Sequence, residues 1–286
     1  MTRIFDLHND AATKLSAKRF LKYINAAEAD TILAAVWTTK IKDPIKKIKE
    51  VRGLIDKAMK ERAKRQQNTK VQPPPNILLH IEDAWFIRPE NIDEVIAMRP
   101  FSVGLVWNQN NALAGGALAD ERLTDWGCTV IKRLLTEGIR VDLAHLNRQS
   151  FWDVMPVLRD AGVRPLCTHT CFDAVCPHLR NLNHDQIKAV VGAGGLIGLT
   201  LVDKFLTPKG RPNLTHVADH IEYFVKNFGA DNLAIGTDFY GAHLPNGLTT
   251  YHDFENLASL LNRRGLSNET IEKIFVGNAR KFFSIL

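Results

Sequence analysis

Short apolar runs rich in β-branched residues alternate with stretches of helical periodicity along the whole chain. Several runs, such as ILAAVW and GLIGLTL, are almost continuously apolar, which is typical of parallel strands buried on both faces. The pattern predicts eight strands, at residues 3–7, 31–37, 76–81, 101–107, 139–144, 164–168, 195–201 and 232–237. Helices are predicted between them, including 124–137, with Thr124 as its N-cap, 148–160, 183–192 and 215–228.

Eight strands that alternate with helices over this length predict an α/β fold, a (β/α)8 TIM-like barrel. A doubly wound open sheet is the competing architecture, but it usually has a glycine-rich phosphate-binding turn after its first strand. Here the strand at 3–7 is followed by His8-Asn9-Asp10, and the glycines at 192–195 precede a strand, as a turn out of a helix would. Strand signals recur on both sides of the proline-rich stretch at 65–75, so we interpret that stretch as a loop and residues 1–286 as one domain.

The net charge of +6 raises the question of nucleic-acid binding. Between Lys40 and Lys70 there are 12 Lys and Arg against 4 Asp and Glu, a local +8, so the rest of the chain carries −2. Apolar residues in this segment, at 45, 48, 51, 55 and 59, have helical spacing, which predicts an amphipathic helix with a solvated basic face. We therefore expect no nucleic-acid partner; the alternative, polyanion binding here, would show as steeply salt-dependent affinity.

Two further features concern location and redox state. No stretch approaches the roughly 18–20 apolar residues that span a bilayer, and the first ten residues lack a signal peptide's apolar core, so we expect a cytoplasmic protein without a membrane anchor. The cysteines, at 128, 167, 171 and 176, lack the C-x2-C spacing of structural zinc sites and are expected to be free thiols.

Imidazoles and carboxylates follow five of the eight predicted strands, which is where an α/β barrel carries its catalytic site. Together these groups suit zinc and similar divalent ions. A pair of ions repels and needs a shared anionic ligand, and two ions a few ångströms apart can hold a bridging hydroxide and polarise a carbonyl. The candidate first-ion ligands are His8 and Asp10, which would point the same way on an extended strand; Glu82 can bridge, and His145 and His169 would complete the second ion.

Seven motifs then occur in one order along nearly the whole chain. They are D-L-H-N-D at 6–10, I-E-D at 81–83, V-D-L-A-H at 141–145, T-H-T at 168–170, L-R-N at 179–181, G-A-G-G-L-I-G at 192–198 and I-G-T-D-F-Y-G at 235–241. In this order they resemble the membrane dipeptidase family of zinc metallopeptidases, of which this chain would be a short, bacterial-type member.

The resemblance implies a distorted (β/α)8 barrel of the metal-dependent hydrolase type that holds two divalent ions, with zinc expected. It implies the same ligands as above: His8 and Asp10 for the first ion, His145 and His169 for the second, and Glu82 as the bridge. Arg180 matches the arginine that binds the substrate's terminal carboxylate, which suits its planar fork of donors. Asp238 matches the aspartate that positions the attacking water or the substrate amine and relays a proton. The resemblance is also compatible with a homodimer.

One motif departs from the family. Trp107, in L-V-W-N at 105–108, stands where the family often has a histidine that contacts the substrate carbonyl, and an indole cannot take up a proton at neutral pH. The predicted function is hydrolysis of the amide bond of a dipeptide or dipeptide-like small molecule by metal-activated hydroxide. The alternative is a non-peptide amide, lactone or ester, with Trp107 as a stacking wall. A non-catalytic binding protein would lack metal ligands, and all five are present.

The remaining histidines are expected to play other parts. We expect His80 to support the site without binding metal, and we expect histidines on helix or loop surfaces at 216, 220, 243 and 252.

Overall fold

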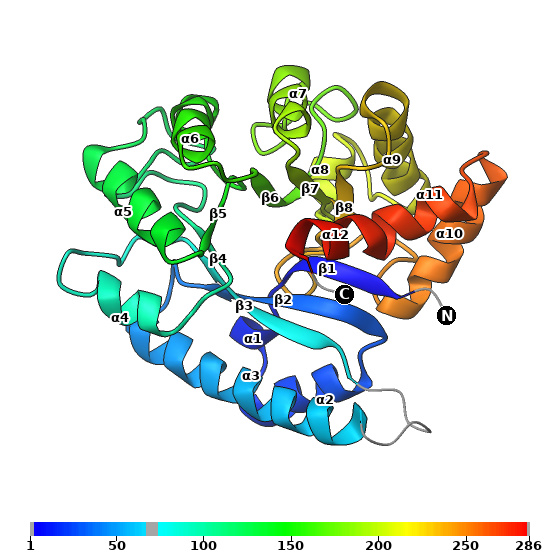
Figure 1. Cartoon of the computed structure of the whole chain (residues 1–286). Coiled ribbons are helices and arrows are strands. Elements are labelled where there is room, and N and C mark those ends of the chain that lie inside the picture. Colours follow the sequence, from blue (N-terminus) through cyan, green and yellow to red (C-terminus); the bar gives the residue numbers. More distant parts are fainter. Residues whose placement is uncertain (1–2, 67–73, 285–286) are drawn as a thin grey trace.

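The computed structural model of the chain describes residues 3–66 and 74–284. Eight parallel strands close into a barrel in sequence order, and β1 pairs with both β2 and β8 (Figure 1). This closure confirms the predicted barrel and excludes the open sheet. Most of the predicted loop at 65–75 lies outside the described residues.

The strands are short, and their hydrogen-bonded parts end before the apolar runs do. Leu105 and Val106, for example, are fully buried although β4 ends at Gly104. The predictions at 101–107, 139–144, 195–201 and 232–237 are therefore too long, because burial continues into the loops beyond the ladder. The bounds are β1 Ile4–Asn9, β2 Ala29–Trp37, β3 Asn76–Glu82, β4 Ser102–Gly104, β5 Arg140–Asp142, β6 Leu166–Thr170, β7 Leu196–Leu199 and β8 Leu233–Ile235.

The helices surround the strands, and Figure 1 shows α3 alongside β2 and β3. The hydroxyl of Thr124 caps α5 by accepting a hydrogen bond from the backbone N–H of Gly127 at 2.9 Å, as predicted. The helices are α1 Ala11–Lys14, α2 Ala17–Ala26, α3 Pro44–Gln66, α4 Ile92–Ala97, α5 Asp125–Thr136, α6 Arg148–Asp160, α7 His184–Gly192, α8 Asp203–Leu206, α9 Leu214–Phe228, η1 Tyr251–Asp253, α10 Phe254–Arg263, α11 Asn268–Glu272, η2 Lys273–Gly277 and α12 Asn278–Phe283.

Helix α3 carries the basic segment. It buries Ile48, Val51 and Ile55 against the barrel and leaves its lysines on the outside, which confirms the predicted amphipathic helix. Within the described residues, no helix combines the length and the apolarity that crossing a bilayer requires. All four cysteines are free thiols, and three of them are buried.

Helix α12 covers the end of the barrel at which the strands begin. Its Phe283 packs against Phe5, near the start of β1, and against Phe101, which precedes β4, with ring centroids 5.3 and 4.7 Å apart. These contacts place α12 at the N-terminal ends of the strands. The C-terminal ends, where barrel enzymes carry their active sites, stay clear of it.

One predicted surface histidine is buried. His220 lies on the inner face of α9, where its Nδ1 accepts a hydrogen bond from the backbone N–H of Phe172 and its Nε2 donates to the carbonyl of Leu206, both at 3.3 Å. The prediction of a surface position is wrong because His220 shares the helix face of buried Val217, Ile221 and Phe224, where its two ring nitrogens find partners. Burial lowers the pKa of His220 to about 4.

This shift predicts a pH-dependent stability. Folded His220 stays neutral while the unfolded chain takes up a proton below about pH 6.5, so its contribution is lost as the pH falls from about 6.5 towards 4. Between pH 6.5 and 5 the loss is about 1.5 kcal/mol. Urea unfolding at both pH values should therefore show a steeper loss for the native protein than for H220Q. The other buried histidines contribute equally to both proteins, so their effect cancels in the difference. An equal loss of unfolding free energy with falling pH in the two proteins would contradict the prediction.

Candidate metal centre

The five predicted ligands converge at the open end of the barrel. They come from four different strands or the loops after them, and all are buried, with His145 the most exposed at 6%. Four of the five, Asp10, Glu82, His145 and His169, line a cavity of about 250 Å³.

Glu82 stands between two groups of donor atoms. Its Oε2 lies 3.5 Å from Nε2 of His8, and that nitrogen lies 3.5 Å from Oδ2 of Asp10. Its Oε1 lies 2.8 Å from Nε2 of His145 and 3.7 Å from Nε2 of His169, and these two nitrogens are 2.8 Å apart. Ligands held about 2 Å from one ion in a tetrahedral arrangement lie about 3.3 Å apart. The measured separations are close to this value, and the two groups share one carboxylate. Ligand atoms of His8, Glu82 and His169 also lie within 4.8 Å of one another.

The hydrogen bonds around the second group leave its inner nitrogens unprotonated. Thr168 Oγ1 donates to Asp142 Oδ2 at 2.5 Å, so it accepts from Nδ1 of His169 at 2.9 Å. Asn108 Oδ1 accepts from Nδ1 of His145 at 3.0 Å. In these tautomers both Nε2 atoms carry lone pairs that face each other at 2.8 Å and repel. A cation between them removes the repulsion, so the donor set fits a metal ion.

Around His8, unpartnered atoms point to the same conclusion. Nε2 of His8 and Oδ1 of Asp10 are buried and make no hydrogen bond within the described part of the chain. Buried polar atoms without partners are costly and rare in native structures. Burial disfavours a charged His8, yet the carboxylates of Glu82 and Asp10 outweigh it and raise the pKa of His8 well above its usual value. The surroundings therefore favour a positive charge at Nε2, which a metal ion supplies.

Register shifts in β1 and β6 orient the side chains of His8 and His169. Phe5 and Leu7 belong to the apolar cluster inside the barrel, so strict alternation would turn His8 away from the interior. The pairing of β1 with β2 shifts register between Asp6 and Asn9, and the pairing of β6 with β7 shifts between Cys167 and Thr170, around His169. Such shifts re-aim side chains and are common next to active sites.

Backbone turns position the other groups. His145 and Asp238 have φ angles of 68° and 59°, in the left-handed region that side chains other than glycine's rarely occupy. Asp10 does not continue the strand, contrary to the extended arrangement predicted with His8, because it is the N-cap residue of α1. It still reaches His8, since the chain turns into the helix directly after β1.

A shell of hydrogen bonds supports the ligands. Asp142, at the end of β5, accepts bonds from the backbone N–H groups of Ala144 and Thr168, which ties β5 to β6 behind the two histidines. His80 bonds through Nδ1 to Ser102 at 2.8 Å, with its Nε2 3.6 Å from Asp142. His80 is buried next to Asp142, and its supporting role stays a prediction. Such outer partners fix the orientation and tautomer of metal-binding imidazoles.

Asp238, in the loop after β8, and Arg180, in the loop after β6, both lie close to the candidate ligands. Carboxylate oxygens of Asp238 and Asp10 and a ring nitrogen of His8 all lie within 4.8 Å of one another. Burial and the charge of Asp10 raise the pKa of Asp238 well above its usual value. Arg180 is 5% exposed and donates from Nη2 to the carbonyl of His169 at 3.2 Å, and the ring of Phe205 lies 5.4 Å from its guanidinium carbon. Phe205, rather than Arg180, lines the cavity.

Two tryptophans form one wall of the cavity. The ring of Trp107 lies 6.0 Å from that of His145 and 5.2 Å from that of Trp37, the last residue of β2. Trp37 and Lys14 also line this cavity, although neither was predicted as a site residue. The sequence signal for Trp37 is its place at the end of a predicted strand, on the same edge as the candidate ligands.

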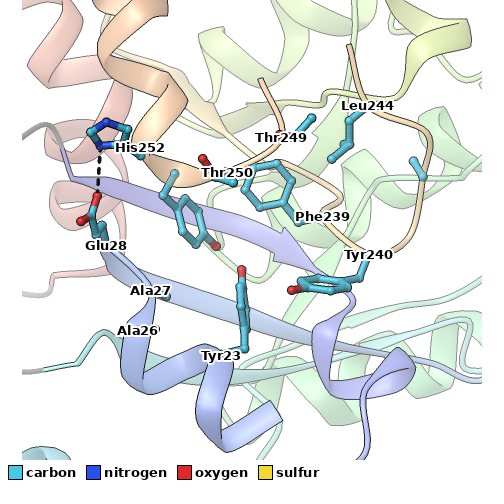
Figure 2. Close-up of a pocket in the computed structure, with 12 residues that line it drawn as sticks. Tyr23, Ala26, Ala27, Glu28, Phe239, Tyr240, Leu244, Thr249, Thr250 and His252 are labelled. Carbon is cyan, nitrogen blue, oxygen red and sulfur yellow. Dashed lines mark ion pairs between the residues drawn. The ribbon is translucent and has the colours of Figure 1, made fainter. Parts of the chain in front are cut away.

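A larger cavity of about 650 Å³ lies on the other side of the loop that follows β8. Figure 2 shows its lining, with Tyr23 and Tyr240 close to each other and an ion pair between Glu28 and His252 at one end. None of the five candidate ligands lines it, and it shares Ala242 with the metal site. It is therefore a separate, mostly apolar hollow beside the candidate centre.

Comparison with known proteins places the chain in one family. The family model of the membrane dipeptidases, peptidase family M19, matches residues 76–285. An uncharacterized protein of the pqqA 5′ region in Klebsiella pneumoniae is 29% identical over 216 residues, which cover 71% of this chain and 79% of that protein.

Two solved structures share the fold across the whole chain. One is a dipeptidase AC of family M19, with a TM-score of 0.86, 19% identity and coverage of 99% of this chain and 98% of the other. The other is a metallo peptidase from Rhodobacter sphaeroides liganded with a phosphinate mimic of the dipeptide L-Ala-D-Ala, with a TM-score of 0.82, 18% identity and the same coverage.

Proposed function

Because the chain belongs to the membrane dipeptidase family, peptidase family M19, and is thus a metallohydrolase, we propose that it is a binuclear zinc dipeptidase. The observation that carries the proposal is the position of Glu82, with each carboxylate oxygen facing a different group of donor atoms. The cavity of about 250 Å³ suits a molecule of dipeptide size better than a protein chain.

Five residues would hold the ions: His8, Asp10 and the bridging Glu82 on one side, and His145, His169 and the same Glu82 on the other. When bound, two divalent ions would supply Lewis acidity at the carbonyl oxygen and lower the pKa of water at the site.

The protein's own groups would then bind the substrate and move the proton. The carboxylate of Asp238 takes a proton from the attacking water as the C–O bond forms, and returns it to the leaving nitrogen as the C–N bond breaks. The guanidinium of Arg180 pairs with the terminal carboxylate of the substrate. Because Phe205 lies over this guanidinium, we expect the short helix α8 to shift when substrate binds.

This role of Arg180 yields a prediction. Replacing it with methionine should raise the KM for dipeptides by about 10- to 100-fold, the cost of losing a charge-assisted hydrogen-bonded pair. The KM for a matching dipeptide amide, which lacks the carboxylate, should change little. Steady-state kinetics on both substrates test the assignment, and a KM for the dipeptide that rises less than a few-fold would count against it.

A second candidate function rests on Trp107. The indole lines the cavity beside His145, at the position where the family often has a proton-carrying histidine. A non-peptide amide, lactone or ester with a flat group could stack there. A panel that combines L,L and L,D dipeptides with such amides, esters and lactones separates the two candidates. Turnover of the dipeptides supports the first, and turnover of only the other compounds supports the second.

A further inference from the structure

Two lysine ammonium groups lie over the tryptophan wall of the cavity. The ammonium of Lys14 lies 4.7 Å from the ring centroid of Trp37, and that of Lys40 lies 5.9 Å from the same ring. Neither lysine forms an ion pair within residues 3–66 and 74–284, and Lys14 also lines the cavity. Two cations therefore share one indole at the rim of the site.

The local chain holds Lys14 in this place. The backbone N–H of Trp37 donates to Thr13 Oγ1 at 3.0 Å, and that hydroxyl donates to the carbonyl of Ala35 at 2.9 Å. These two bonds fasten α1 to the end of β2. Lys14 follows Thr13 directly, so its side chain stays close to Trp37 and the cavity.

The wall lies on the side of the centre that the substrate's amino end would occupy. If Arg180 takes the terminal carboxylate from the side of β6, and Glu82 marks the reacting carbonyl, then the N-terminal residue extends towards Asp10, Asp238 and Trp37. This orientation rests on the proposed dipeptidase function. The two carboxylates would then face the α-amino group, and Lys14 would face the side chain.

The position of Lys14 relative to Asp10 fits one kind of residue. Asp10 is the N-cap residue of α1 and Lys14 is its last residue, and both line the cavity. A substrate whose α-amino group meets Asp10 can place its side chain beside the ammonium of Lys14, which suits a side chain that ends in a carboxylate. We propose that Lys14, assisted by Lys40, forms a subsite that selects dipeptides with an acidic N-terminal residue.

The test compares two substrates that differ only in charge, L-Glu-Ala and L-Gln-Ala, each with L- and D-alanine. The native enzyme should prefer the glutamyl substrate by about fivefold in kcat/KM, and the preference should fall as salt is added. K14M should reduce the preference to less than about twofold, because kcat/KM for the glutamyl substrates falls. K188M, an exposed change on α7, is the matched control and should keep the native preference.

The outcomes separate the two proposals. Equal use of both substrates by the native enzyme, or an unchanged preference in K14M, would overturn the acidic subsite and leave the dipeptidase function standing. Failure to hydrolyse any of the four dipeptides would overturn the dipeptidase function itself.

Discussion

Replacing Glu82 with glutamine should lower kcat/KM for dipeptides on the order of 10³-fold or more, because this carboxylate belongs to both groups of donor atoms. Glutamine keeps the size of the side chain but removes the negative charge that two neighbouring cations share. We therefore also expect E82Q to retain at most one ion per chain after reconstitution with zinc and gel filtration, as measured by elemental analysis.

The control for this change is E90Q, which alters an exposed glutamate eight residues further along the chain and should keep full activity and metal content. Circular dichroism should show that both variants fold. An E82Q protein that keeps two ions and more than a tenth of the native activity would exclude Glu82 as the bridge.

The second large effect is expected at a residue with no side chain. A methyl group on Gly241 would lie 2.1 Å from Oδ1 of Asp238 and 2.2 Å from Oδ2 of Asp10, so G241A must displace one or both carboxylates or the loop that carries them. We expect metal affinity to fall by about 10- to 100-fold and activity by at least as much, the usual cost of disturbing groups that orient metal ligands. Zinc titration against a competing chelator, together with dipeptide kinetics, measures both.

The matched control is G53A on α3, where an added methyl group meets no atom within 4 Å. Alanine is the better helix former there, so G53A should stabilise the protein slightly and leave activity unchanged. If G241A bound metal and turned over substrate as G53A does, the tight packing of the loop against the two carboxylates would not matter for function.

The barrel could be predicted from the sequence because parallel strands buried on both faces leave nearly continuous apolar runs. The bounds could not, since apolar residues such as Leu105 continue into loops that are just as buried as the strands. The burial of His220 could not be predicted either. Periodicity along a helix shows which residues share a face, but a polar residue type does not show whether other elements supply hydrogen-bond partners that allow it to be buried.

The candidate site could be predicted as a set of residue types at strand ends, but its geometry could not. The register shifts around His8 and His169, and the left-handed turns at His145 and Asp238, depend on contacts between strands far apart in the chain. The cover of Phe205 over Arg180 likewise depends on the path of the loop after β7. The residue types of the candidate site thus follow from the sequence, whereas the directions of their side chains depend on the fold.

We propose that two divalent ions, held by five residues that share Glu82, make this protein a dipeptidase. The most direct measurement removes metal with a chelator, adds zinc back in steps and follows both bound zinc and dipeptide hydrolysis. Our account predicts that activity returns with zinc and reaches a plateau near two ions per chain. Saturation at one ion with full activity would contradict the binuclear centre, and hydrolysis by the metal-free protein would contradict the account as a whole.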